Sequence, residues 1–107
     1  MDFTFTLTTS PPDAFVRAYG ELDVFTSQRL TSGMNEAVDG GCRRVLLDLV
    51  DVSFVDAGAL RALDRFRTQL ADLGGSLRVV GTSPRFQNLC RMTGLDSAFG
   101  LSDALPA

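Results

Sequence analysis

The sequence predicts a single α/β domain with a mostly parallel sheet of four to five strands, an antiparallel hairpin at its N-terminal edge, and three main helices packed on the sheet. Its 107 residues suit one domain, residues 1–107. After two strand-like stretches, helical and strand-like patterns alternate, which is the order that right-handed βαβ crossovers produce. Gly-Gly pairs at 40–41 and 74–75 each separate a helical pattern from an apolar strand.

The N-terminal hairpin is predicted from alternation. Phe3, Phe5 and Leu7 alternate with threonines, the period of two that is typical of a half-buried strand. Residues 10–13, Ser-Pro-Pro-Asp, form a turn, because proline fixes φ and aspartate bonds to its own backbone. Residues 14–19 then form a second strand, antiparallel to the first and ended by the glycine that follows it.

The first helix is predicted over residues 26–39. Leu30, Met34 and Val38 recur at intervals of four, which makes one apolar stripe on a helix. The glycine pair 40–41 supplies the left-handed stop.

The central strand is predicted at residues 44–49, whose continuous apolar run suits a strand that is covered on both faces. Residues 50–55 are expected to form a loop that leads to the second helix. The residues expected to face the core from that helix are Leu60, Leu63, Phe66 (or Arg67), Leu70 and Leu73.

The last strand is predicted at residues 77–80 and is followed by a third helix. Ser83 is the expected N-cap, with proline at the first helical position. Gly94 ends this helix, residues 95–99 form a short strand or turn, and residues 101–107 hold one turn at most. The side chains expected to point inward are Phe86, Leu89, Cys90 and Thr93.

Composition excludes several kinds of chemistry. The chain has no histidine, so it lacks an imidazole base and a histidine metal ligand, and two cysteines cannot build a four-cysteine zinc site. The net charge of −3 argues against binding nucleic acid. No apolar run is long enough to cross a membrane, and the start does not resemble a signal peptide. We therefore expect a cytoplasmic protein that is not membrane-embedded, needs no cofactor and is not an enzyme.

The candidate functional surface lies where the parallel strands end. Ligands and partners of open α/β sheets meet the loops at the carboxyl ends of the strands. Three such loops are expected, at residues 20–25, 50–59 and 81–84. Asp23, Asp56 and Ser83 should therefore share one end of the molecule.

Asp56 stands where the N-cap of the second helix belongs, and small residues follow it at Ala57, Gly58 and Ala59. One interpretation is a plain cap with tight packing. The other is that the small residues leave room for a bulky partner, because a glycine inside a helix costs about 1 kcal/mol relative to alanine.

Three other readings of these residues carry less weight. A bound phosphate would meet carboxylates at this helix start, and no glycine-rich nucleotide loop is present. Asp23 and Asp56 as an acid–base pair would lack a deep pocket. Cys42 and Cys90 are expected to be buried, with a redox switch as the alternative.

An ordered set of motifs resembles the STAS domain of bacterial anti-sigma factor antagonists. The set consists of Gly-Glu-Leu-Asp at 20–23, the run Leu-Leu-Asp-Leu-Val-Asp-Val-Ser-Phe-Val-Asp at 46–56, then Leu60, Gly74 and Leu-Arg-Val-Val at 77–80. The resemblance covers about residues 14–99. It implies that the chain binds a kinase-type anti-sigma factor, which in this family phosphorylates a serine just after the loop aspartate and so ends the complex.

This chain departs from the family pattern at the acceptor position. The family usually reads Asp-Ser-Ser-Gly-Leu or Asp-Ser-Ala-Gly-Leu, whereas residues 56–60 read Asp-Ala-Gly-Ala-Leu. Ala57 has no hydroxyl, so no phosphorylation is expected at that position. The partner-binding residues that the resemblance implies are Asp23, Asp56, Ala57, Gly58, Ala59, Leu60 and Ser83.

Two functional classes remain open. The chain is either an antagonist that stays unphosphorylated and binds a kinase-type anti-sigma factor, or a STAS accessory subunit of a lipid-transport ATPase, a group that also tends to lack the acceptor serine. A monomer or a weak homodimer is expected, because the first strand leaves one edge exposed.

Overall fold

The computed structural model describes residues 3–95 and 98–99. The elements are β1 (Thr4–Ser10), β2 (Asp13–Leu22), α1 (Val24–Asp39), β3 (Arg44–Val55), α2 (Ala57–Asp72), β4 (Ser76–Val80) and α3 (Pro84–Thr93). The four strands lie in the order β1-β2-β3-β4, with β1 antiparallel to β2 and the other pairs parallel. The predicted α/β architecture is confirmed; residues 101–107 and part of 95–99 lie outside the described residues.

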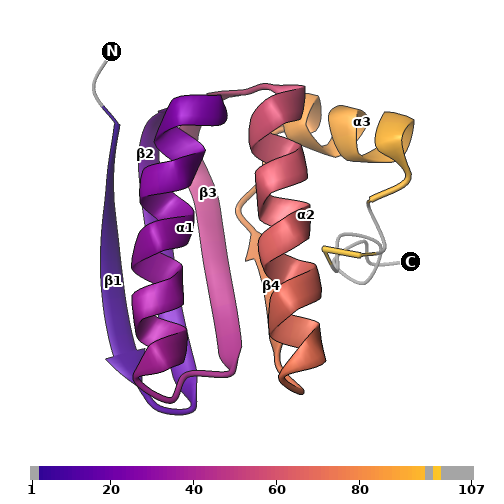
Figure 1. The fold of residues 1–107 in the computed structure, drawn as a ribbon. Coiled ribbons are helices and arrows are strands. Elements are labelled where there is room, and N and C mark those ends of the chain that lie inside the picture. The colour runs from indigo at the N-terminus through magenta and orange to yellow at the C-terminus, as the bar shows by residue number, and fades with distance from the viewer. Residues whose placement is uncertain (1–2, 96–97, 100–107) are drawn as a thin grey trace.

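The two long helices lie side by side across one face of the sheet (Figure 1). Each parallel strand is the spatial neighbour of the one before it, so both crossovers run in the same direction. Right-handed crossovers of that kind place their helices on the same side. The prediction that the central strand is covered on both faces is therefore wrong. Phe15 is 41% exposed on the uncovered face.

The hairpin is confirmed, with different ends. Ser10 pairs with Asp13 across the turn, and the bond between the two prolines is cis. β2 does not stop at Gly20 but continues to Leu22, because this glycine adopts a φ of 103° where the register with β3 shifts. Leu7 is more exposed than the alternation predicts, since it lines a shallow groove of about 200 Å³ beside α1.

β3 is longer than the apolar run indicates. Residues 50–55, predicted as a loop, continue the strand to Val55 because β2 continues beside them. Glu21 pairs with Phe54, and Leu22 pairs with Val55. The extension brings the end of β3 directly to the start of α2.

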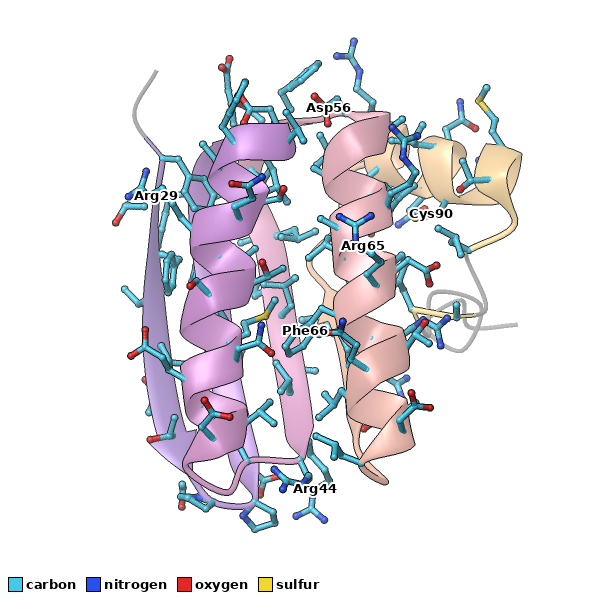
Figure 2. The ribbon with its side chains drawn as sticks, in the orientation of Figure 1. Arg29, Arg44, Asp56, Arg65, Phe66 and Cys90 are labelled. Carbon is cyan, nitrogen blue, oxygen red and sulfur yellow. The ribbon has the colours of Figure 1, made fainter. Side chains whose placement is uncertain are left out.

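The hydrophobic core fills the space between the sheet and the helices. Its largest fully buried side chains include Phe86, Phe99, Leu30 and Met34. Figure 2 shows Phe66 of α2 pointing into the space between the two long helices. Cys42 and Cys90 are both buried, as predicted.

Two residues predicted to face the core do not. Leu73 is 56% exposed, because α2 ends at Asp72 and Leu73 is its C-cap. Thr93 is exposed, and its hydroxyl donates to the carbonyls of Leu89 and Cys90 within the helix. Leu89 itself is only partly buried against the core.

We expect Gly75→Ala to lower the free energy of unfolding by about 2 kcal/mol, the usual size of an overpacking penalty. A Cβ here would overlap the backbone oxygen of Arg43 and lie 2.7 Å from a methyl of Leu70. That oxygen cannot move away, because it accepts the N–H of Ser76 at 2.8 Å. Urea unfolding measures the loss.

Gly40→Ala is the matched control. Gly40 has a φ of −83°, and a Cβ there would come no closer than 3.4 Å to another atom. Its effect should stay below about 0.5 kcal/mol. Equal losses for the two variants would contradict the steric explanation.

Candidate functional site

Three helices begin at the same end of the sheet, and each begins at one of the residues selected from the sequence. Asp23, Asp56 and Ser83 are the N-caps of α1, α2 and α3. Because β2, β3 and β4 are parallel, the helices that follow them all start where these strands end. Figure 2 shows Asp56 at this end and Arg44 at the opposite one. We call this end of the molecule the helix-start surface.

Asp23 forms a capping box with Thr26. Its Oδ1 accepts the backbone N–H groups of Phe25 at 2.9 Å and of Thr26 at 2.8 Å. The hydroxyl of Thr26 in turn accepts the N–H of Asp23 at 2.8 Å. The N–H of Thr26 is the main cause that holds the pKa of the Asp23 carboxyl below its ordinary value. Desolvation, the next largest effect, opposes it, and the N–H of Phe25 and the hydroxyl of Thr26 lower the pKa further.

Asp56 and Ser83 satisfy the starts of the other two helices. Asp56 Oδ1 accepts the N–H of Ala59 at 2.8 Å, and Ser83 Oγ accepts the N–H of Phe86 at 3.1 Å. Such caps replace the missing partners of the first N–H groups. These carboxylates and this hydroxyl are therefore turned toward their own helices.

The four residues after Asp56 differ in their surroundings. Ala57 is exposed and Gly58 is half-buried, whereas Ala59 and Leu60 are 0% and 1% exposed. The side chains of Ala59 and Leu60 belong to the core, which corrects the expectation that they contact a partner. They hold the helix start against the sheet instead.

Gly58 has a packing role that the sequence did not reveal. A Cβ at this position would lie 3.3 Å from Cβ of Val24, the first residue of α1. Glycine therefore lets the starts of α1 and α2 approach each other. This contact gives the glycine a packing role inside the chain, beside the predicted role of leaving room for a partner.

Sequence reasoning missed a set of exposed apolar side chains at the helix-start surface. Phe25 is 75% exposed in the first turn of α1, beside Val24 at 44%. Phe54, two residues before Asp56, is 39% exposed. Met92 is 80% exposed on α3 and lines a hollow of about 350 Å³ with Val55 at the end of β3. The sequence signal for Phe25 is its place in the first turn of α1, directly after the N-cap Asp23 and its neighbour Val24.

The hydroxyls near Ala57 are all engaged. Ser53 donates to the carbonyl of Gly20, and Thr82 accepts from the amide of Gln87. Ser83 is occupied as the cap described above. None of them occupies position 57.

The described residues offer little for catalysis or metal binding. They contain no group of three or more acidic or cysteine side chains placed to hold a metal ion. Asp51 of β3 pairs with Arg17 of β2 at 2.6 Å. No helix in the described ranges is both long and apolar enough to span a bilayer.

Comparison with known proteins places the fold. The model of the STAS domain family matches residues 4–106, so the chain belongs to the STAS domain family. The family that the sequence motifs resemble is thereby confirmed.

Solved structures of the same fold come from several bacteria. An anti-sigma factor antagonist from Mycobacterium paratuberculosis superposes with a TM-score of 0.80 at 24% identity, covering 96% of this chain and 91% of that one. Phosphorylated SpoIIAA, a cell fate determinant of Bacillus, gives 0.72 at 18% identity, with coverages of 89% and 87%. A sulfate transporter family protein from Wolinella succinogenes gives 0.72 at 19%, with coverages of 87% and 75%. At these identities the likeness is one of fold.

We expect Asp23→Asn to lose a contribution to stability that depends on pH. Asparagine still caps the helix. The lowered pKa of Asp23 means that its carboxylate stabilises the fold fully above the ordinary value of 3.8 and loses that effect as the pH falls through the folded value. The difference in unfolding free energy between wild type and variant should therefore be largest near neutral pH and shrink toward about pH 3.

Urea unfolding at several pH values measures this difference. Asp39→Asn is the control, since it removes one exposed carboxylate that forms no hydrogen bond within the described part of the chain. Parallel curves for wild type and Asp23→Asn would show that the capping hydrogen bonds do not favour the charged form.

Proposed function

We propose that this protein is an anti-sigma factor antagonist that binds a kinase-type anti-sigma factor through the helix-start surface. The observation that carries the proposal is that apolar side chains, Phe25 above all, are exposed beside the three N-caps. Phe25 alone leaves three-quarters of its surface in water. Burying an apolar side chain of this kind contributes about 1.5–3 kcal/mol, and aromatic anchors dominate protein interfaces.

The arrangement of the charged groups supports a protein partner over a free anion. Each cap already occupies one or two of the N–H groups that would bind a phosphate at its helix start. The exposed surface beside the caps includes apolar area from Val24, Phe25 and Phe54 and the small side chain of Ala57. Two exposed arginines, Arg61 and Arg85, lie near the starts of α2 and α3. An interface of about 800 Å² per partner fits a domain of this size.

The role of Asp23, Asp56, Gly58 and Ser83 in this proposal is to shape the surface. The two aspartates and the serine fix where each helix begins, and Gly58 lets α1 and α2 come close. The side chains that would enter the interface are those of Phe25, Phe54 and Ala57.

The missing hydroxyl at position 57 determines how the proposed complex would be regulated. Solved relatives include SpoIIAA in a phosphorylated form. In this chain the first residue of α2 is alanine, so the complex would not be ended by phosphorylation there. We therefore propose an antagonist that stays competent to bind.

We expect Ala57→Glu to weaken the complex with the anti-sigma factor by at least about tenfold, or 1.4 kcal/mol. The variant places a carboxylate at the first position of α2, where a helix dipole favours negative charge by about 0.3–1 kcal/mol. It should therefore fold as well as wild type, and any lost binding is local. Gln69→Glu adds the same charge at an exposed position farther along α2 and should bind normally.

Capture from the lysate of the native host, followed by mass spectrometry and calorimetry, makes the test. A kinase-fold anti-sigma factor held by wild type and Gln69→Glu but lost with Ala57→Glu is the expected result. Recovery of transporter ATPase subunits instead would assign the chain to the accessory-subunit class. Unchanged affinity of Ala57→Glu would remove the proposed surface.

A complementary variant restores the hydroxyl. When the purified kinase-type partner and ATP are added, Ala57→Ser should gain one phosphate by intact mass and leave the complex, whereas wild type should gain none at this position. Phosphorylation of wild type at Ser53, Thr82 or Ser83 would show that another hydroxyl has taken over the switch.

A further inference from the structure

The face of the sheet opposite the helices carries side chains in regular rows, because the strands pair in register. One row runs Thr8–Phe15–Leu46–Arg78 across all four strands, and the next runs Ser10–Asp13–Arg44–Ser76. Alternate residues of each strand point to opposite faces, so all eight side chains lie on the uncovered side. This surface is separate from the helix-start surface.

These two rows line an open cavity of about 450 Å³ on the sheet face. Its floor is apolar, with Phe15 41% exposed and Leu46 half-buried next to it. Hydroxyls of Thr8, Ser10 and Ser76 stand around this floor. Small-molecule sites have about this size, roughly 300–1,000 Å³, and combine an apolar lining with a few polar groups.

The two arginines of the cavity are in different states. Arg44 is held by Asp13 through two hydrogen bonds, at 2.7 and 3.2 Å, so its charge is balanced. The Arg44 guanidinium also keeps the pKa of the Asp13 carboxyl below its usual range. Arg78 has no ion pair or hydrogen bond to any of residues 3–95 and 98–99 through its side chain. Among the described residues, the Arg78 charge in this cavity has no ion-pair partner, in a protein whose net charge is −3.

We propose that this cavity binds a small monoanion with a flat apolar body, such as an aromatic carboxylate. The carboxylate accepts the paired N–H groups of the Arg78 guanidinium, a geometry that favours two parallel hydrogen bonds. The ring lies on Phe15 and Leu46, where offset stacking adds to the burial of apolar surface. The Asp13–Arg44 ion pair lies at one end of the cavity. Because its two charges balance, it neither attracts nor repels the ligand's carboxylate strongly.

The geometry favours an anion over a cation and over a neutral molecule. Within residues 3–95 and 98–99, the only carboxylate that lines the cavity is Asp13, which already pairs with Arg44. A cation would meet Arg78 without a compensating acid. A neutral ligand would leave the Arg78 donors to water and gain only the apolar contact.

Titration of the full chain with 2-naphthoate, followed by ¹H–¹⁵N correlation spectra, tests this proposal. The neutral analogue 2-naphthamide has the same ring and should bind at least about tenfold more weakly, the factor expected for a lost charge-assisted hydrogen bond. Shifted amides should fall on β2, β3 and β4 around Phe15, Leu46 and Arg78. Equal affinity for the two probes, or no binding of naphthoate, would overturn the proposal.

Two variants, each with a matched control, locate the site. Arg78→Gln should weaken naphthoate at least about tenfold, whereas Arg65→Gln, which removes an exposed arginine of α2 on the other face (Figure 2), should not. Phe15→Thr keeps a residue type that favours strands but removes the aromatic ring at the base of the cavity. It should therefore lower the affinity for both naphthoate and naphthamide. Phe25→Ala removes a ring that is 75% exposed, against 41% for Phe15, from the helix-start surface and should leave naphthoate affinity unchanged.

The outcomes separate this site from the proposed function. Phe25→Ala addresses partner binding, and Arg78→Gln addresses the cavity, so either can fail without the other. Thermal unfolding of each variant confirms that it is folded. Naphthoate binding that survives Arg78→Gln, or shifts confined to the helix starts, would place the ligand elsewhere and refute the cavity.

Discussion

The direction in which successive strands are added to the sheet determines most of this structure. β2, β3 and β4 follow one another across the sheet in chain order, and each helical crossover between them passes over the same face of the sheet. This constraint gathers α1 and α2 on one face, leaves the other face uncovered, and brings every helix start to one end (Figure 1). The two candidate surfaces of the molecule both follow from it.

The helix-start surface owes its character to how the N-caps are used. A bare helix start attracts anions, because its first N–H groups lack partners and its dipole is positive there. Here Asp23 accepts two of these N–H groups and Asp56 accepts one, and their carboxylates place negative charge at the positive ends of α1 and α2. The exposed side chains near these caps include the apolar groups of Phe25 and Phe54 as well as Arg61 and Arg85. In the proposed interface, Phe25 and Phe54 supply apolar contacts, and an added carboxylate at position 57 is expected to disrupt them.

Much of the fold could be predicted from the sequence, because local signals agreed with one another. Periods of two and of four gave the hairpin and the helices, and Asp56 and Ser83 were recognised as caps. The end of β3 was missed, since Asp51 and Ser53 interrupt its apolar run. Only pairing with the extended end of β2 shows that Phe54 and Val55 continue the strand.

The candidate site was predicted in position but not in detail. The topology alone brought Asp23, Asp56 and Ser83 together. It did not reveal that Ala59 and Leu60 are buried, that Gly58 packs against Val24, or that Phe25 is exposed, because these depend on how closely α1 and α2 approach. Strand order was equally hidden, so an apolar central strand was taken to be covered on both faces.

The uncovered sheet face also divides the strands into two sets of positions with different tolerance to change. In β2, Ala14, Val16 and Ala18 are buried and constrained by packing, whereas Phe15, Arg17 and Tyr19 point away from the core. Substitutions in the second set leave the core volume intact, and effects at well-separated sites add. Evolution and protein engineering can therefore redesign this face for a new ligand while the domain keeps its stability and its opposite surfaces.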